Sequence, residues 1–65
     1  MKQCSVYCVD TKTDRVADIL EENDKRIKVA FENTDITLVL VRQDTRFPYI
    51  GFVNGMEFET FGEME

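Results

Sequence analysis

Two cysteines, Cys4 and Cys8, carry the most distinctive chemistry in this chain, and their spacing limits what they can do. On a strand, residues four apart lie on one face at about 3.3 Å per residue, roughly 13 Å apart, which is beyond disulfide reach. Two thiolates do not complete a four-ligand zinc site, and the chain has 0 histidines. We therefore predict two free thiols that act as small core residues, with no metal site and no cofactor.

Catalysis would have to depend on carboxylates, because histidine, the side chain most often used as a general base, is absent. Asp18 with Glu57, or Glu21 with Glu59, are the candidate acid–base pairs. Strand alternation places most of these carboxylates on solvated faces, where ordinary surface charge is the better interpretation. Cys8 has no histidine to activate it as a nucleophile. We therefore expect a protein that is not an enzyme and has no catalytic residues.

Arginine and aromatic residues gather around one segment without strand pattern, residues 43–48, and these are the candidate binding residues. Binding residues often lie on loops held by a rigid scaffold, and Arg and Tyr are enriched at binding hot spots. This pattern predicts a small protein-binding module, a regulator or adaptor for another, unidentified protein. The candidate partner-binding residues are Arg42, Arg46, Phe47 and Tyr49.

There are two alternative functions: nucleic-acid binding, which would depend on the same arginine and aromatic residues, and nucleic-acid mimicry, which would depend on the overall charge. Phe47, Tyr49 and Phe52, beside Arg42 and Arg46, resemble a stacking surface for single-stranded nucleic acid. The net charge of −5 opposes nucleic-acid binding, and Phe52 fits the core better. A third hypothesis is an acidic mimic of nucleic acid that blocks a basic cleft, but 13 acidic against 8 basic residues is a modest excess. We therefore rank nucleic-acid binding second and mimicry third.

The chain length restricts the architecture to one small domain. At 65 residues, only about 60% of the unfolded chain's surface can be buried, so stability is marginal. We expect a single domain over residues 1–65, with a frayed tail at 62–65. The sequence shows neither a secretory leader nor an apolar run of about 18 residues, which predicts a soluble cytoplasmic protein without membrane contact.

A hairpin over residues 25–42 is the strongest structural feature of the sequence. Its two arms alternate apolar and polar residues with a period of two, and a turn at residues 32–35 joins them. One register places six large apolar side chains on one face, and a slip by one residue would expose them all. The predicted pairs are Phe31 with Ile36, Val29 with Leu38 and Ile27 with Leu40 on the inner face, and Ala30 with Thr37, Lys28 with Val39 and Arg26 with Val41 on the outer face.

The outer face of this hairpin leaves Val39 and Val41 exposed, and two adjacent valines favour a covering partner. A symmetric homodimer would cover them, with basic residues beside the valines pairing with Glu57 or Glu59 of the second copy. The alternative is a monomer in which the first or last strand crosses this face. The predicted dimer face consists of Arg26, Lys28, Val39 and Val41.

Residues 13–22 are ambiguous, because Val16, Ile19 and Leu20 also fit a helical stripe. We favour a strand. A two-residue turn at residues 23–24 would pair Leu20 with Ile27 and Val16 with Phe31, and would also form two charge pairs.

Asn54-Gly55 is the strongest turn signal, since this dipeptide tolerates the positive φ angles of a type I′ turn between residues 49–53 and 56–61. Asparagine-centred turns at Asn23, Asn33 and Asn54 separate short β-rich runs. Closing one sheet buries its inner face and removes its edges. The predicted fold is therefore a mainly β, antiparallel meander of five to six strands closed into an SH3-like barrel, ahead of an OB-type barrel. The other alternative places a helix at about 13–22 on a four- or five-stranded sheet.

Overall fold

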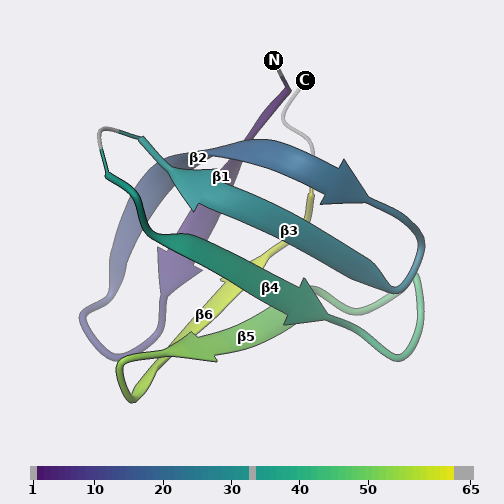
Figure 1. The fold of residues 1–65 in the computed structure, drawn as a ribbon. Helices are drawn as coiled ribbons and strands as arrows, with labels where there is room; N and C mark the ends of the chain where they lie inside the picture. Colours follow the sequence, from purple (N-terminus) through teal and green to yellow (C-terminus); the bar gives the residue numbers. More distant parts are fainter. Residues whose placement is uncertain (1, 33, 63–65) are drawn as a thin grey trace.

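Alternation of apolar and polar residues along the chain produces six antiparallel strands that close into a small barrel (Figure 1). The computed structural model describes residues 2–32 and 34–62. The strands are β1 (Gln3–Cys8), β2 (Thr13–Glu22), β3 (Arg26–Phe31), β4 (Thr37–Val41), β5 (Tyr49–Val53) and β6 (Met56–Thr60). Each strand pairs with the next along the chain, and β1 also pairs with β6. The predicted all-β meander is confirmed and is consistent with a small SH3-like barrel, whereas the helix alternative at 13–22 is wrong because β2 covers that segment.

The central hairpin has the predicted register from one end to the other. The pairs run without a shift from Arg26–Val41 through Lys28–Val39 to Ala30–Thr37, as expected. The inner-face prediction is wrong at Ile36, which is 43% exposed. Ile36 precedes the first residue of β4, and its carbonyl accepts the Phe31 N–H at 3.0 Å while its side chain stays outside the barrel.

The predicted register between β2 and β3 is wrong. The Asn23 side-chain oxygen accepts the backbone N–H groups of Lys25 and Arg26, each at 2.9 Å, which makes the turn longer than two residues. Ala17 therefore pairs with Phe31, and a bulge follows Ile19. The inward residues of β2 are accordingly Ala17 and Ile19, while the residues expected inside, Val16 and Leu20, are 40% and 41% exposed.

All six strands contribute to one core. The rings of Phe31 and Phe58 meet there at a centroid distance of 5.5 Å. Cys4 and Cys8 are buried and unoxidised on the inner face of β1, so the prediction of free core thiols is confirmed. The buried residues are Cys4, Val6, Cys8, Ala17, Ile19, Ile27, Val29, Phe31, Leu38, Leu40, Tyr49 and Phe58.

The hairpin β5–β6 closes the barrel through two short seams. At one seam, β1 pairs with β6 at Tyr7–Glu59 and Cys8–Phe58, and at the other, β4 pairs with β5 at Val41–Ile50. Within the hairpin the pairing is continuous from Tyr49–Thr60 to Val53–Met56. The turn itself is as predicted, with φ of 52° at Asn54 and 75° at Gly55.

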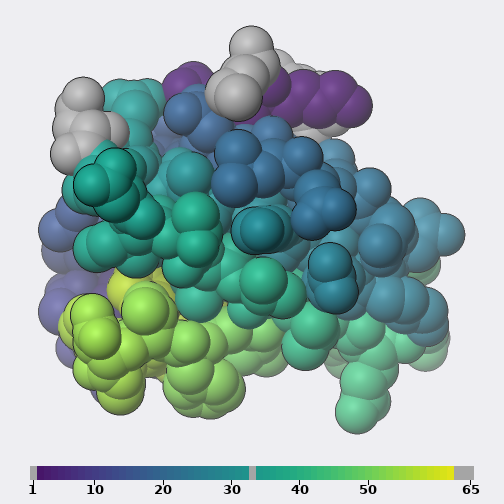
Figure 2. All heavy atoms as spheres, in the orientation of Figure 1, coloured from purple at the N-terminus to yellow at the C-terminus, as the bar shows by residue number. Residues whose placement is uncertain are grey.

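Neither the first nor the last strand covers the outer face of the central hairpin. β1 pairs with β2 and β6, so neither it nor β6 crosses β4 in the described part of the chain. Figure 2 shows atoms of β3, β4 and β5 together on one face, with the purple N-terminal segment at its upper edge. Gly62 is buried and its N–H donates to the Thr60 hydroxyl at 3.2 Å, while the rest of the expected tail, residues 63–65, lies outside the described residues. Among residues 2–32 and 34–62 there is no helix long and apolar enough to cross a membrane.

Candidate functional site

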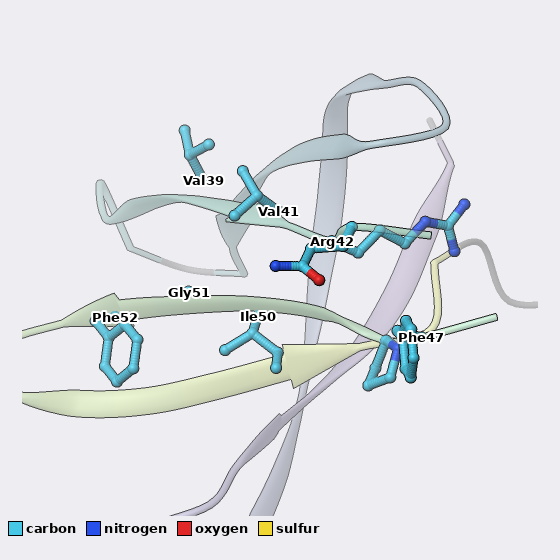
Figure 3. A pocket seen from close by; sticks show the side chains of 9 residues that line it. Val39, Val41, Arg42, Phe47, Ile50, Gly51 and Phe52 are labelled. Atoms are coloured by element: carbon cyan, nitrogen blue, oxygen red, sulfur yellow. The ribbon is translucent and has the colours of Figure 1, made fainter. Parts of the chain in front are cut away.

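An open apolar groove of about 730 Å³ runs along the outer side of β4 and β5 and ends at the 43–48 connection (Figure 3). We call it the β4–β5 groove. β4 contributes one wall, β5 the other, and the connection closes one end. Its apolar lining consists of Val39, Val41, Phe47, Pro48, Ile50 and Phe52.

Gly51 lets the β5 backbone approach β4 at the centre of the groove. A Cβ added at Gly51 would lie 2.5 Å from the Val39 carbonyl oxygen and 3.1 Å from Cγ of Leu40. On its other side, Gly51 pairs with Phe58 of β6. Its tightest restriction is the backbone of β4, so any side chain at this position would push the two strands apart.

The side chains around the groove are apolar and exposed to an unusual degree. Phe52 is 68% exposed, Val41 55%, Phe47 52% and Val39 44%. The expectation that Phe52 belongs to the core is therefore wrong. Tyr49 and Gly51 point inward on β5, and strand alternation consequently turns Phe52 outward.

Arg42 and Tyr49, both predicted partner-binding residues, are engaged with the chain's own turn at residues 23–25. The guanidinium of Arg42 stacks on the Tyr49 ring, and its Nε donates to the Asp24 carbonyl at 2.6 Å. Tyr49 is only 2% exposed, and its hydroxyl donates to the Asn23 carbonyl at 2.7 Å. Arg42 thus borders the end of the groove, whereas Tyr49 supports the groove from inside the barrel.

Arg46 and Phe47, the other two predicted binding residues, face solvent. The Asp44 carboxylate accepts the Arg46 backbone N–H at 2.9 Å and lies 3.3 Å from its guanidinium. These hydrogen bonds hold the pKa of the Asp44 carboxyl below its ordinary value. Lys25 Nζ also donates to the Gln43 carbonyl at 2.6 Å, so the start of the connection is tied to the turn between β2 and β3.

The outer residues of four strands form rows with an ordered charge pattern across the groove. Arg26 pairs with Val41, Val41 with Ile50, and Ile50 with Glu59. One step along the strands, Lys28 pairs with Val39 and Phe52 with Glu57. The predicted dimer face is therefore continuous with the groove, which has a basic flank on β3 and an acidic flank on β6.

The candidate catalytic carboxylates lie on strands that are not neighbours. Asp18 and Glu21 are on β2, Glu57 and Glu59 are on β6, and β1 lies between the two strands. The Asp18 carboxylate accepts a hydrogen bond from the Gln3 amide at 3.1 Å. In the part of the chain that the structure describes, no three Asp, Glu, Cys or His residues are grouped as metal ligands.

The two buried thiols differ in their electrostatic surroundings. Burial raises the pKa of the Cys4 thiol, whereas a hydrogen bond from the Thr11 side chain lowers the pKa of the Cys8 thiol. Cys8 also borders a smaller hollow of about 260 Å³, next to Phe31 and Phe58. Nothing beside Cys8 in this hollow supplies a histidine base, since the chain contains 0 histidines.

Comparison of the chain with protein families, with curated proteins and with solved structures gives no match. Functional inference therefore depends on the geometry of the groove. Sequence reasoning found Val39, Val41 and Phe47, assigned Phe52 to the core and missed Ile50. The missing signal was the phase of β5: once Tyr49 is placed inside, alternation turns both Ile50 and Phe52 outward.

Proposed function

We propose that this chain is a non-enzymatic protein-binding module that docks another protein in the β4–β5 groove. The observation that carries this proposal is the exposed apolar surface of Val39, Val41, Phe47 and Phe52, with the half-buried Ile50 between them, around a real depression. Patches of this kind on small soluble domains commonly mark interaction sites. Fully exposing one such side chain forgoes about 1.5–3 kcal/mol of burial, which a domain with few core residues can recover by binding.

The surrounding structure supports docking without large rearrangement. Each groove wall is paired along its length with its outer neighbour, β4 with β3 and β5 with β6, and the Arg42–Tyr49 stack fixes the end where the 43–48 connection begins. A rigid site loses little conformational entropy when a partner binds. The charged flanks add orientation, because rim charges steer association and select partners more than they increase affinity.

Affinity capture with two matched variants tests this proposal. Val41→Lys introduces a charge into the groove, and Val16→Lys introduces the same charge on the outward side of β2, far from the groove in strand order. We expect wild type and Val16→Lys to capture the same partner and Val41→Lys to lose it. Circular dichroism and thermal melting show whether both variants remain folded. Capture by Val41→Lys at the wild-type level would contradict the assignment of the groove.

Single-stranded nucleic-acid binding is the second candidate, favoured by the exposure of Phe47 and Phe52 and by the position of the Arg46 guanidinium over the Phe47 ring. Exposed rings beside arginine can stack on bases. The net charge of −5 opposes it, and Tyr49 has no exposed ring to contribute. Titration of a labelled oligonucleotide in low salt separates the two functions. Micromolar binding that weakens steeply with salt and is lost in Phe52→Ala would favour nucleic acid.

A further inference from the structure

The two flanks of the β4–β5 groove carry opposite charges at matching positions along the strands. Arg26 and Lys28 form the basic flank, and Glu59 and Glu57 lie at the corresponding levels of the acidic flank. Within the described residues, Lys28, Glu57 and Glu59 make no side-chain hydrogen bond or ion pair, so their charges are available to a partner. Arg26 approaches Glu21 at 3.9 Å, with both side chains more than half exposed.

This pattern is complementary to itself under one kind of two-fold symmetry. When two copies meet face to face, a two-fold axis that runs along the strands places the basic flank of each copy opposite the acidic flank of the other. The level along the strands is unchanged by this operation, so Lys28 meets Glu57 and Arg26 meets Glu59. An in-plane axis perpendicular to the strands would instead place like charges together, which is unfavourable.

We propose that a second copy of this chain occupies the β4–β5 groove, related to the first by a two-fold axis parallel to β4 and β5. The inference rests on the proposed function, because it uses the same groove, and it names the partner. Isologous contact lets a single surface supply both sides of the interface. Phe52, 68% exposed on the groove wall, supplies an aromatic side chain for the groove of the other copy.

The size of the surface predicts a weak dimer. A stable standard interface buries about 800 Å² on each partner, and two five-residue strands with their flanks provide less than that. The barrel also curves away on both sides of the groove, so that the charged flanks meet through the ends of their side chains. We therefore expect a dissociation constant in the micromolar range that increases with salt, because exposed ion pairs are screened.

Sedimentation equilibrium from about 5 to 500 µM tests the presence and place of the dimer with matched variants. Val39 is 44% exposed on the groove and Val16 is 40% exposed on β2, so Val39→Lys and Val16→Lys add the same charge at equally accessible positions. We expect wild type and Val16→Lys to dimerise and Val39→Lys to lose at least tenfold in affinity while remaining folded. If Val39→Lys unfolds, Val41→Lys, at a site 55% exposed, replaces it. A wild type that stays monomeric throughout, or a groove variant that dimerises normally, overturns the proposal.

A charge exchange tests the symmetry. Lys28→Glu alone places a glutamate opposite Glu57 of the other copy. Glu57→Lys alone places a lysine opposite Lys28 of the other copy. Each contact occurs twice in the dimer, so we expect each single variant to weaken dimerisation roughly 2- to 30-fold at low salt. The double variant Lys28→Glu with Glu57→Lys restores opposite charges and should recover most of the wild-type affinity. Failure of the double variant to recover would overturn this arrangement of the copies.

The two proposals fail in different ways. A monomeric wild type whose capture of another protein is still lost in Val41→Lys overturns the homodimer and leaves the binding module in place. Normal dimerisation in Val39→Lys, together with unaltered capture in Val41→Lys, contradicts both the groove and its occupant. If the second copy does occupy the groove, it competes there with any other protein partner. Dilution below the dimer dissociation constant should then increase capture of that other partner.

Discussion

The guanidinium carbon of Arg42 lies 4.1 Å from the centroid of the Tyr49 ring, directly beside the Val41–Ile50 pair that joins β4 to β5. Both side chains also donate to carbonyl groups of the turn between β2 and β3. A single stacked pair therefore links three parts of the barrel at a seam with little backbone pairing. Arg42 and Tyr49, both predicted partner-binding residues, therefore also have a structural role at this seam.

Tyr49→Phe should lower the free energy of unfolding by about 1 kcal/mol at neutral pH, because the hydrogen bond to the Asn23 carbonyl is lost. The difference from wild type should depend on pH. Burial raises the pKa of the Tyr49 hydroxyl above its ordinary value of 10.0, so the folded state holds this proton more tightly than the unfolded state. That stabilisation is complete below the unfolded pKa and is lost as pH rises through and above it.

Urea denaturation of wild type and Tyr49→Phe between pH 7 and 11 checks this expectation. The stability difference between them should narrow above about pH 10. The two proteins differ only at residue 49, so contributions from the rest of the chain cancel in the comparison. A difference that stays constant over the whole range would contradict the assigned effect of burial on Tyr49.

The central hairpin could be predicted from sequence because both arms alternate and one register buries the inner residues of β3 and β4, although Ile36, just before β4, stays outside. β2 could not, since its register depends on two local details: the side-chain oxygen of Asn23 lengthens the turn, and the bulge after Ile19 shifts the remaining pairs. Neither feature has a periodic signature. The register of the central hairpin thus follows from strand alternation, whereas that of β2 depends on a side-chain hydrogen bond and a bulge.

The groove was only partly predictable for a related reason. Val39 and Val41 were expected outside because the hairpin register fixes their side. Which of Tyr49 and Phe52 is buried depends on the phase of β5, and that phase is set by the pairing of Val41 with Ile50 across a long connection. Residue type alone does not distinguish the two, because both Tyr49 and Phe52 are aromatic residues that favour burial. The position of Gly51 against the Val39 carbonyl is likewise a tertiary contact, so the glycine's main function was not visible in its neighbours.

Gly51→Ala should destabilise the barrel by about 1–3 kcal/mol, because its Cβ would lie 2.5 Å from a backbone oxygen that cannot move aside alone. The strands would have to separate at the seam that has the least pairing. Urea denaturation measures the loss. Intrinsic fluorescence of the tyrosines or circular dichroism at 218 nm is a suitable signal for the transition.

Gly55→Ala is the matched comparison, since its added methyl group has nothing within 4 Å. Its cost should come from the positive φ of 75° alone, about 1–2 kcal/mol. Gly55→Asn should recover part of that loss because asparagine tolerates this conformation, whereas Gly51→Asn should be worse than Gly51→Ala. An asparagine that is tolerated equally at both positions would show that close approach does not restrict Gly51.

The β5–β6 hairpin should open more readily than the β3–β4 hairpin. Among the described residues, strand pairing at its two seams is limited to Tyr7–Glu59, Cys8–Phe58 and Val41–Ile50, and the Val9 N–H also donates to the Glu57 carbonyl at 3.0 Å. Local opening that breaks few contacts requires less free energy than global unfolding. Native-state hydrogen exchange should therefore show faster exchange for amides between β4 and β5 than for those between β3 and β4.

Denaturant dependence distinguishes local opening from global unfolding. Exchange at the β4–β5 seam should depend weakly on urea, because little surface is exposed, whereas exchange at the Lys28–Val39 pair should have the slope of global unfolding. Identical protection and identical slopes in both hairpins would mean that the barrel opens as one unit.

Cys8 should react with iodoacetamide several-fold faster than Cys4 at pH 8 in the folded protein. The thiolate is the reactive form, and the hydrogen bond from Thr11 lowers the pKa of Cys8 while burial raises the pKa of Cys4. Access of the reagent to the two sulfur atoms also favours faster reaction of Cys8. Cys8 lies at the short seam with Phe58 and is 3% exposed, whereas Cys4 is 0% exposed within the continuous pairing of β1 with β2.

Tandem mass spectrometry assigns the label to each cysteine over time. Thr11→Val should slow labelling of Cys8 without changing that of Cys4, because it removes the hydroxyl that stabilises the thiolate. In 6 M guanidinium chloride the two cysteines should react at nearly equal rates, since both differences belong to the folded state. Faster labelling of Cys4 in the folded protein, or an unchanged Cys8 rate in Thr11→Val, would show that the Thr11 hydrogen bond does not control the reactivity of Cys8.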